Sequence, residues 1–112
     1  MRIMSNVLLA VLPLVVATPA LALKTSWYEC CNPKTAYGYP FSANDKHIAA
    51  SKKLAYGTRI LLSYKGKTLC VTVRDKGPFV GNRELDITRA GAEHLGMKKA
   101  GVVDLQAKIN GC

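Results

Sequence analysis

Hydrophobic and polar residues alternate along several short segments in the second half of the chain, as they do in half-buried β-strands. Residues 58–64 and 67–73 are two such segments, and Lys65-Gly66 separates them. Two residues with a glycine between two strand patterns predict a β-hairpin with a tight turn. Residues 102–109 alternate in the same way and are expected to form a closing strand, whose apolar side carries Val103, Leu105, Ala107 and Ile109.

The other segments predict two short strands and one helix. Residues 25–28 and 83–87 have strand character. Thr88 can cap a helix over residues 89–95, and Gly96 fits the position just past its end.

The remaining stretches are less regular. Residues 32–44 contain two prolines, one glycine and two tyrosines, which predicts a long ordered loop. Residues 46–51 carry no pattern that assigns them to an element. About six strands and one short helix favour a mainly β fold, a small six-stranded barrel that closes on itself and leaves no sheet edge exposed.

The N-terminus has the pattern of an export signal. Arg2 supplies a positive start, residues 7–17 are apolar apart from one proline, and Ala20-Leu21-Ala22 offers a small-x-small cleavage site. We therefore expect residues 1–22 to be a signal peptide and residues 23–112 to be one mature domain. The apolar run is shorter than the roughly 20 residues that span a bilayer, so we expect no transmembrane anchor. The residue after the expected cleavage site is not a cysteine, which favours a periplasmic or secreted protein without a lipid anchor.

Four cysteines remain in the mature domain: Cys30, Cys31, Cys70 and Cys112. An even count in an exported chain favours two disulfides. Adjacent cysteines rarely bond each other because the geometry is strained. Two connectivities then stay open, and each ties the N-terminal region to both Cys70 and Cys112. The spacing lacks a C-x-x-C pair and the histidines are scattered, so a zinc site is not expected.

The chain is strongly basic, with 16 Lys and Arg against 7 Asp and Glu, a formal net charge of +9. This charge favours polyanions, anionic cell walls or membrane surfaces as partners. An export signal without a nucleic-acid motif argues against nucleic acid. No P-loop, dinucleotide fingerprint, G-x-S-x-G or H-E-x-x-H is present, so no cofactor is expected.

Three acidic residues lie at predicted strands or strand ends, where a catalytic carboxyl group could be placed. Asp75 follows an apolar strand and opens a Gly-Pro loop, and Glu84 and Asp86 are two residues apart on one strand, so both would face the same way. A helix starting at Thr88 would favour the ionised form of Asp86 and lower its pKa. Burial against Trp27, Tyr28 or Phe79, or repulsion from Glu84, would raise it.

Several segments together resemble the rare lipoprotein A (RlpA-like) domain, a double-psi β-barrel related to the first domain of expansins. They occur in one line along the mature chain, the most specific being Asp-Lys-Gly-Pro-Phe-Val and Leu-Asp-Ile-Thr, and they are residues 25–28, 35–38, 49–50, 54–59, 73–80, 85–88 and 92–96.

This resemblance implies a peptidoglycan lytic transglycosylase that acts on glycan strands, and we expect a monomer. The family aspartate falls on Asp86, which is the candidate general acid, and Asp75 matches a second family acid. Trp27, Tyr28 and Glu84 are candidates for substrate binding.

Two positions depart from the family pattern. Tyr39 follows Gly38 where the family has Glu, and Ser51 follows Ala49-Ala50 where the family has His. His47, four residues earlier, could replace that histidine if the loop is rearranged. Tyr39, Ser51 and His47 are therefore also candidate cleft residues.

Two alternatives to an enzyme remain open from the sequence. Tyr39 and Ser51 favour a non-catalytic glycan-binding or expansin-like wall-loosening module. The four cysteines, which are not part of the family pattern, favour a secreted effector that binds a protein. Retention of both Asp75 and Asp86 favours the enzyme.

Overall fold

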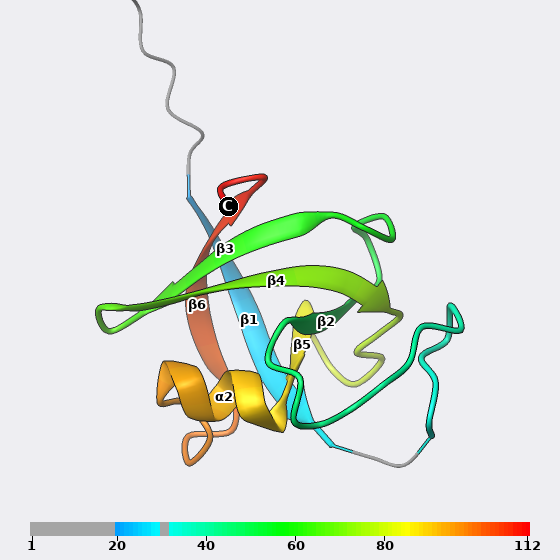
Figure 1. Cartoon of the computed structure of the whole chain (residues 1–112). Coiled ribbons are helices and arrows are strands. Elements are labelled where there is room, and N and C mark those ends of the chain that lie inside the picture. The colour runs from blue at the N-terminus through cyan, green and yellow to red at the C-terminus, as the bar shows by residue number, and fades with distance from the viewer. Residues whose placement is uncertain (1–19, 30–31) are drawn as a thin grey trace, which may run out of the picture.

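The computed structural model describes residues 20–29 and 32–112, which form a closed barrel of six strands with one short helix (Figure 1). The strands neighbour one another in the order β1-β5-β2-β4-β3-β6. Two neighbouring pairs are parallel, β1 with β5 and β2 with β4, and the others are antiparallel. The elements are β1 Leu21–Tyr28, β2 Ile48–Ser51, β3 Arg59–Tyr64, β4 Lys67–Asp75, β5 Leu85–Thr88, α2 Arg89–Leu95 and β6 Val103–Ile109.

The mainly β barrel expected from the sequence is confirmed, and so is its central hairpin. β3 and β4 pair from Arg59↔Thr72 to Tyr64↔Lys67. The turn between them has positive φ at Lys65 (47°) and Gly66 (85°), the conformation that makes glycine favourable there.

β1 is longer than expected, because it begins at Leu21 rather than Thr25. Leu21 pairs with Ala107 and Leu23 with Leu105, so the added residues extend the ladder with β6. The expected cleavage after Ala22 falls inside this strand and stays a prediction, since residues 1–19 lie outside the described part. Within residues 20–29 and 32–112, no helix is long and apolar enough to cross a membrane.

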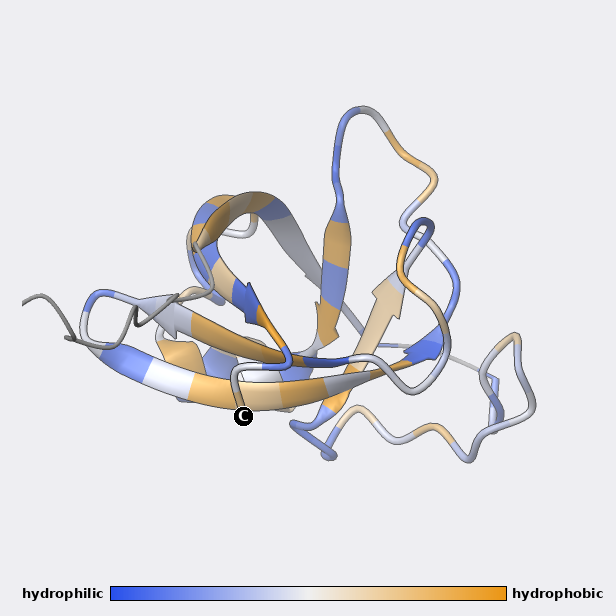
Figure 2. Cartoon of the chain, turned by 90° about the horizontal axis from the view of Figure 1, so that it is seen from above, coloured by the Kyte–Doolittle hydropathy of each residue, from blue (hydrophilic) through white to orange (hydrophobic). Residues whose placement is uncertain are grey.

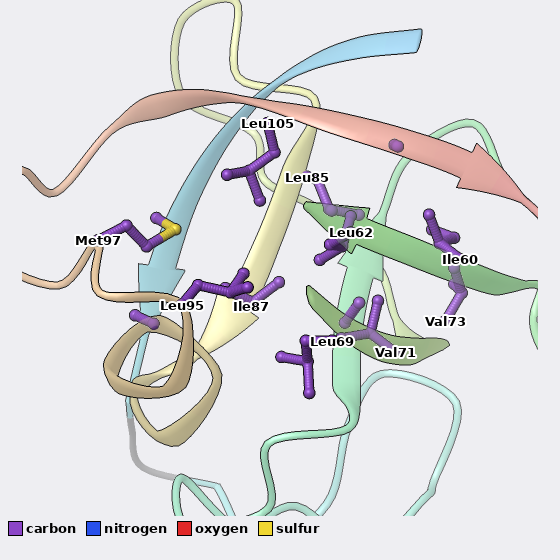
Figure 3. Close-up of a cluster of buried hydrophobic side chains, with 13 residues drawn as sticks. Ile60, Leu62, Leu69, Val71, Val73, Leu85, Ile87, Leu95, Met97 and Leu105 are labelled. Carbon is purple, nitrogen blue, oxygen red and sulfur yellow. The ribbon is translucent and has the colours of Figure 1, made fainter. Parts of the chain in front are cut away.

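The core lies inside the barrel, where buried residues of β2 to β6 meet the apolar face of α2 (Figure 3). Leu23 and Trp27 of β1 are partly buried and pack against this cluster. Along β6, Leu105 and Ala107 are buried while Asp104 and Gln106 are exposed, as the alternation predicts. Figure 2 shows the same alternation of hydrophilic and hydrophobic bands along the strands. The largest fully buried side chains include Ile60, Leu62, Leu85, Ile87, Leu95, Met97 and Leu105.

The helix begins and ends where the sequence predicts. Thr88 caps it, accepting a 3.1 Å hydrogen bond from the Gly91 amide, and Gly96 has the left-handed conformation (φ 74°) just past Leu95. The helix follows directly on β5, as Figure 1 shows, and it contacts β4, β1 and β5. Its buried residues are Gly91, Ala92 and Leu95.

The loop between β1 and β2 is held against the start of α2. The Thr88 hydroxyl donates to the Asp45 carbonyl at 2.8 Å, and the Ala90 amide donates to the Ala43 carbonyl at 3.0 Å. A Cβ on Gly91 would lie 3.2 Å from the Lys46 carbonyl oxygen, so glycine permits this close approach. The loop expected over residues 32–44 is therefore both present and anchored.

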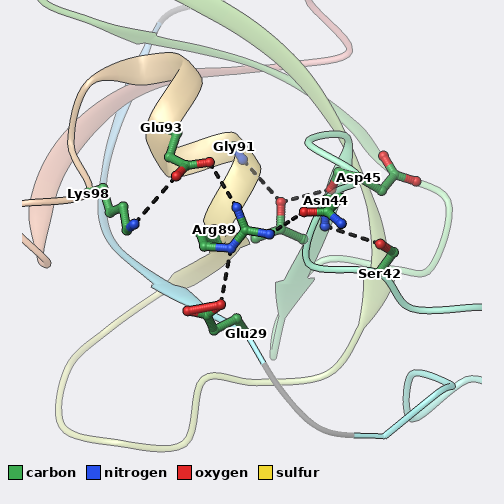
Figure 4. Close-up of polar contacts among 9 residues, drawn as sticks. Glu29, Ser42, Asn44, Asp45, Arg89, Gly91, Glu93 and Lys98 are labelled. Atoms are coloured by element: carbon green, nitrogen blue, oxygen red, sulfur yellow. Dashed lines mark hydrogen bonds and ion pairs between the residues drawn. The ribbon is translucent and has the colours of Figure 1, made fainter.

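Arg89 adds side-chain contacts to the same junction (Figure 4). Its guanidinium donates to Glu29 and to Glu93 at 3.0 Å each, and to Asn44 Oδ1. A single arginine thus joins the end of β1, the loop and the helix.

The cysteine pairing corrects the expected connectivity. Cys70 of β4 is bonded to Cys112, with 5.9 Å between their Cα atoms, so neither cysteine pairs with the N-terminal region. Cys112 reaches Cys70 because of the order of the strands in the barrel. Only β3 separates β4 from β6, and the tail after β6 crosses β3 toward β4. Asn110 donates to the Arg59 carbonyl at 2.7 Å, and this contact directs Cys112 toward Cys70. Cys30 and Cys31 lie outside the described residues.

This pairing predicts a specific cross-linked peptide. A digest of the oxidised mature protein should contain the segment around Cys70 joined to the C-terminal segment, and reduction should separate them. Replacing both residues (Cys70→Ser with Cys112→Ser) should lower the free energy of unfolding by about 2–4 kcal/mol, because the closed loop restricts the unfolded chain. A peptide that joins Cys70 to Cys30 or Cys31 would contradict the structure.

Candidate active site

Both candidate catalytic acids lie in one row of residues that crosses four neighbouring strands. Ser26 of β1 pairs with Asp86 of β5, Asp86 pairs with Ala50 of β2, and Ala50 pairs with Asp75 of β4. Residues paired across strands project to the same face of a sheet. Since the flanking Leu85 and Ile87 are fully buried, this row faces outward from the core. The small Ala50 therefore lies between two carboxyl groups.

Asp86 is partly buried and accepts a 2.9 Å hydrogen bond from the Ser26 hydroxyl. Burial raises the pKa of Asp86 from 3.8 to about 6, and the negative charge of Asp75 adds to this rise. The hydrogen bond from Ser26 and the charge of Arg83 oppose it. The carboxyl group is thus half protonated near pH 6, where a general acid is useful.

The expected competition between burial and the helix at Asp86 is resolved in favour of burial. Asp86 lies in β5, two residues before the cap of α2, and the field of a helix acts mainly within its first turn. Two of the side chains expected to bury it do not, since Phe79 is 75% exposed and Trp27 lies on the other face of β1.

Asp75 ends β4 and organises the loop beside it. One carboxylate oxygen accepts from the Tyr28 hydroxyl at 2.8 Å, and the other accepts from the Ala36 and Lys76 amides at 2.8 and 2.9 Å. These three bonds hold β1, the long loop and the end of β4 together. Asp75 is therefore a fixed acceptor, in contrast to Asp86.

Tyr28 is hydrogen-bonded to Asp75 and is affected by the charges of both acids. Burial, the hydrogen bond to Asp75 and the charges of Asp75 and Asp86 all raise the pKa of Tyr28 above its ordinary value of 10. Its hydroxyl therefore stays protonated and keeps donating to Asp75. The Tyr28 ring packs at 5.1 Å from the Phe41 ring.

An open hollow adjoins this group of residues. It has a volume of about 490 Å³, and its walls are Tyr28 and Asp75 on the barrel and residues of the long loop. The loop residues that line it are Asn32, Pro33, Lys34, Thr35, Ala36 and Phe41. A ligand in this hollow would contact Tyr28 and Asp75 directly. Asp86 does not line the hollow and lies two positions further along the row, beyond Ala50.

The other candidate residues lie elsewhere. The Trp27 indole donates to the Lys98 carbonyl at 3.0 Å and packs against the core, away from the outward row. Ser51 is 3% exposed, and its hydroxyl accepts the Lys53 and Leu54 amides at 3.2 and 3.0 Å. Its side chain therefore stabilises a turn instead of facing Asp86.

His47, Tyr39 and Glu84 also have partners of their own. His47 precedes β2, and its Nδ1 lies 2.8 Å from the Cys70 carbonyl oxygen. The Tyr39 ring lies 4.5 Å below the Arg74 guanidinium, one residue from Asp75. Glu84 accepts the Lys24 amide at 3.0 Å and lines a second hollow.

Ser26 and Ala50 are site residues that sequence reasoning missed. Ser26 is two residues before Tyr28 on the same strand, so the period-two pattern places both side chains on one face. Ala50 could be placed between the acids only once the strand order was known. Within the described part of the chain, no group of three or more His, Cys, Asp and Glu side chains could hold a metal ion.

Comparison with known proteins identifies the family to which the chain is similar. A family model described as lytic transglycolase matches residues 20–107. The "Probable endolytic peptidoglycan transglycosylase RlpA" of Aquifex aeolicus is 39% identical over 93 residues, which are 78% of this chain and 40% of that protein. The endolytic peptidoglycan transglycosylase RlpA of Neisseria meningitidis serogroup B is 34% identical over 85 residues, 72% of this chain and 35% of that protein. This chain spans less than half the length of these relatives.

Solved structures share the fold. The Streptomyces papain inhibitor superposes with a TM-score of 0.67 at 24% identity, over 80% of this chain and 93% of that one. Cerato-platanin 2 of M. perniciosa superposes with a TM-score of 0.59 at 14% identity, over 79% and 93%.

Fold and site together define a small double-psi β-barrel whose outer face carries a pair of carboxyl groups. The chain belongs to the lytic transglycolase family, which confirms the RlpA-like resemblance seen in the sequence.

The raised pKa of Asp86 predicts a pH-dependent gain in stability from Asp86→Asn. Because the folded-state pKa (about 6) exceeds the ordinary value (3.8), the wild type loses stability as pH rises between these values. Asparagine cannot ionise, so the variant should match the wild-type Tm near pH 4 and exceed it at pH 8, on the order of a few degrees. Thermal denaturation at both pH values measures this. A gain of equal size at pH 4 would contradict a buried, protonatable carboxyl.

Proposed function

We propose that this domain cleaves the glycan strands of peptidoglycan as a lytic transglycosylase, with Asp86 as the general acid. The observation that carries the proposal is the Asp86 carboxyl, which burial keeps protonated to about pH 6. It lies in one row of paired residues with Asp75, which forms part of the wall of the open hollow. Family membership and the names of the relatives support the choice of substrate and reaction.

The reaction can be written with this one acid. Asp86 donates its proton to the glycosidic oxygen, the bond from that oxygen to C1 breaks, and the sugar gains oxocarbenium character. The 6-hydroxyl of the same muramoyl residue then forms a bond to C1, and its proton returns to the Asp86 carboxylate. The products are a shortened strand and a 1,6-anhydro end, and no water is consumed.

Asp75 and Tyr28 support this step by position and charge. A fixed carboxylate at the end of β4, separated from β5 by β2, would stabilise the positive charge that develops on the sugar. Tyr28 and the amides of Ala36 and Lys76 prevent Asp75 from moving during the reaction. Tyr28 also forms part of the wall that the sugar would contact.

Peptidoglycan lies outside the cytoplasmic membrane, so the proposal places the domain in the periplasm or outside the cell. The export signal expected over residues 1–22 agrees with that place. The excess of basic residues suits an anionic wall.

A non-catalytic glycan-binding module is the second candidate. The observation in its favour is that Ser51 and His47 point to partners of their own, a turn and the Cys70 carbonyl. In the enzyme, by contrast, Asp86 would have to act as both acid and base, because neither Ser51 nor His47 faces it.

Cleavage of sacculi distinguishes the two candidates. Incubation of the mature protein with sacculi and with peptide-free glycan strands should release anhydro-muramoyl ends, measured by mass spectrometry. Asp86→Asn should lower the rate by about 10²–10⁴-fold because it removes the proton donor. Asp75→Asn should lower it less, because the positioning charge is lost while the donor remains.

Glu93→Gln on the exposed surface of α2 is the matched control and should act like the wild type. Wild-type protein that sediments with sacculi but releases no anhydro ends would establish the binding module. Equal rates for Asp86→Asn and the wild type would reject Asp86 as the acid.

The rate should also depend on pH in a defined direction. Only the protonated form of Asp86 can donate, so the rate should fall as pH rises through about 6, approaching tenfold per pH unit on the alkaline side. Initial rates of anhydro-end release between pH 4 and 8 measure this. A rate that rises steadily from pH 5 to 8 would show that the ionised carboxylate is the working form.

A further inference from the structure

A second hollow lies on the other side of Asp86 along the same outer face. Lys24, Ser26 and Tyr28 alternate along β1, so their side chains share that face. Ser26 bonds to Asp86, and Tyr28 lines the hollow already described. Lys24 lines another hollow of about 370 Å³. With a rise of about 3.3 Å per residue, Lys24 and Tyr28 stand roughly 13 Å apart along the strand, with Asp86 between them.

Basic side chains dominate this second hollow, which we call the basic hollow. Lys24, Lys52, Lys53 and Arg83 line it, together with two acids, Glu84 and Asp104. In the part of the chain that the structure describes, none of the four cations lies within 4.0 Å of a carboxylate oxygen. Their charge is therefore available to a ligand, in contrast to that of Arg89, whose guanidinium is engaged by Glu29 and Glu93.

The local backbone places two of these lysines at the basic hollow. Ser51 ends β2, and its buried hydroxyl accepts the amides of Lys53 and Leu54. This turn presents Lys52 and Lys53, both exposed, at the rim of the basic hollow. On the opposite side, Glu84 and Lys24 are joined by two hydrogen bonds, of 3.0 and 2.8 Å, that fix the β1–β5 wall.

We propose that the basic hollow is a binding subsite for an anionic group, a carboxylate or a phosphate, carried by the wall polymer whose glycan occupies the row at Asp86. The proposal rests on the proposed glycan substrate and adds a second point of attachment to it. Muramoyl residues carry a lactyl carboxyl group, and wall-linked polymers can carry phosphate, so both sources offer this chemistry. A strand held in both hollows would pass over Asp86.

Attachment there would also affect the acid itself. The positive charge of Arg83 lowers the pKa of Asp86. An anion bound against Arg83 would offset that charge, so Asp86 would retain its proton to a higher pH when the subsite is filled. Binding and proton donation are coupled in this arrangement.

Binding measurements in an inactive background test the subsite without relying on cleavage. In Asp86→Asn protein, the affinity for fluorescent peptide-free glycan strands would be compared with that of the same protein carrying Lys52→Gln and Lys53→Gln. We expect the added pair to weaken binding roughly five- to tenfold and to reduce its dependence on salt. The control pair, Lys99→Gln with Lys108→Gln, removes the same charge from exposed positions that line neither hollow and should leave affinity near the parent value.

Chemical variants of the probe identify the anion. Glycan strands whose carboxyl groups have been converted to methylamides should bind about as weakly as the lysine variant binds unmodified strands, if the group is a carboxylate. If it is a phosphate, amidation should have little effect, and removal of phosphate polymers from sacculi by hydrofluoric acid should weaken sedimentation instead. Equal loss of affinity in both lysine pairs, or full affinity after both treatments, would overturn the subsite.

This result is separate from the proposed reaction. Anhydro-end release by the wild type together with unchanged binding by the Lys52 and Lys53 variant would reject the subsite alone. Specific loss of binding together with no product from the wild type would keep the subsite and reject the reaction.

Discussion

The candidate site depends on the register of β5 between its two neighbours. Pairing of Asp86 with Ser26 on one side and Ala50 on the other sends Leu85 and Ile87 into the core and keeps the carboxyl group on the outer face. A slip of one residue would exchange the two faces, exposing both apolar side chains and burying the acid. Hydrophobic packing therefore fixes the position of the acid, and the residues around Asp86 need only adjust its proton affinity.

The pKa of Asp86 reflects a balance between effects that raise it and effects that lower it. Burial beside β1 and β2 favours the neutral carboxyl group, and Asp75 reinforces this by charge. Ser26 and Arg83 favour the ionised form and keep the pKa of Asp86 near 6 rather than higher. Asp75, at the end of the same row, accepts three hydrogen bonds instead of one from a single hydroxyl. The two aspartates thus have different hydrogen-bonding environments, although both lie in the same row.

Local signals predicted the parts of the fold that are determined locally. The β3–β4 hairpin, the caps of α2 and the alternation in β6 each depend on neighbouring residues, and each is confirmed. β2 could not be assigned because all four of its residues are buried, which removes the alternation that identifies a strand. The pairing of Cys70 with Cys112 and the position of Ala50 between the acids are set by strand order, which depends on contacts distant in sequence.

The candidate site was predicted only in part, because its residues also come from strands that are distant in sequence. Asp86, Asp75 and Tyr28 do come together, whereas Trp27 faces the core side of β1, since strand parity separates it from its neighbour Tyr28. Ser51 departs from the family pattern yet has a clear structural role, because its hydroxyl forms the turn that carries Lys52 and Lys53. A histidine at position 51 has no hydroxyl oxygen and so could not accept the hydrogen bonds of both amides in this way. Ser51 therefore replaces a proton-transfer group of the family pattern with a turn that places Lys52 and Lys53 at the rim of the basic hollow, and the proposed anion subsite depends on this turn.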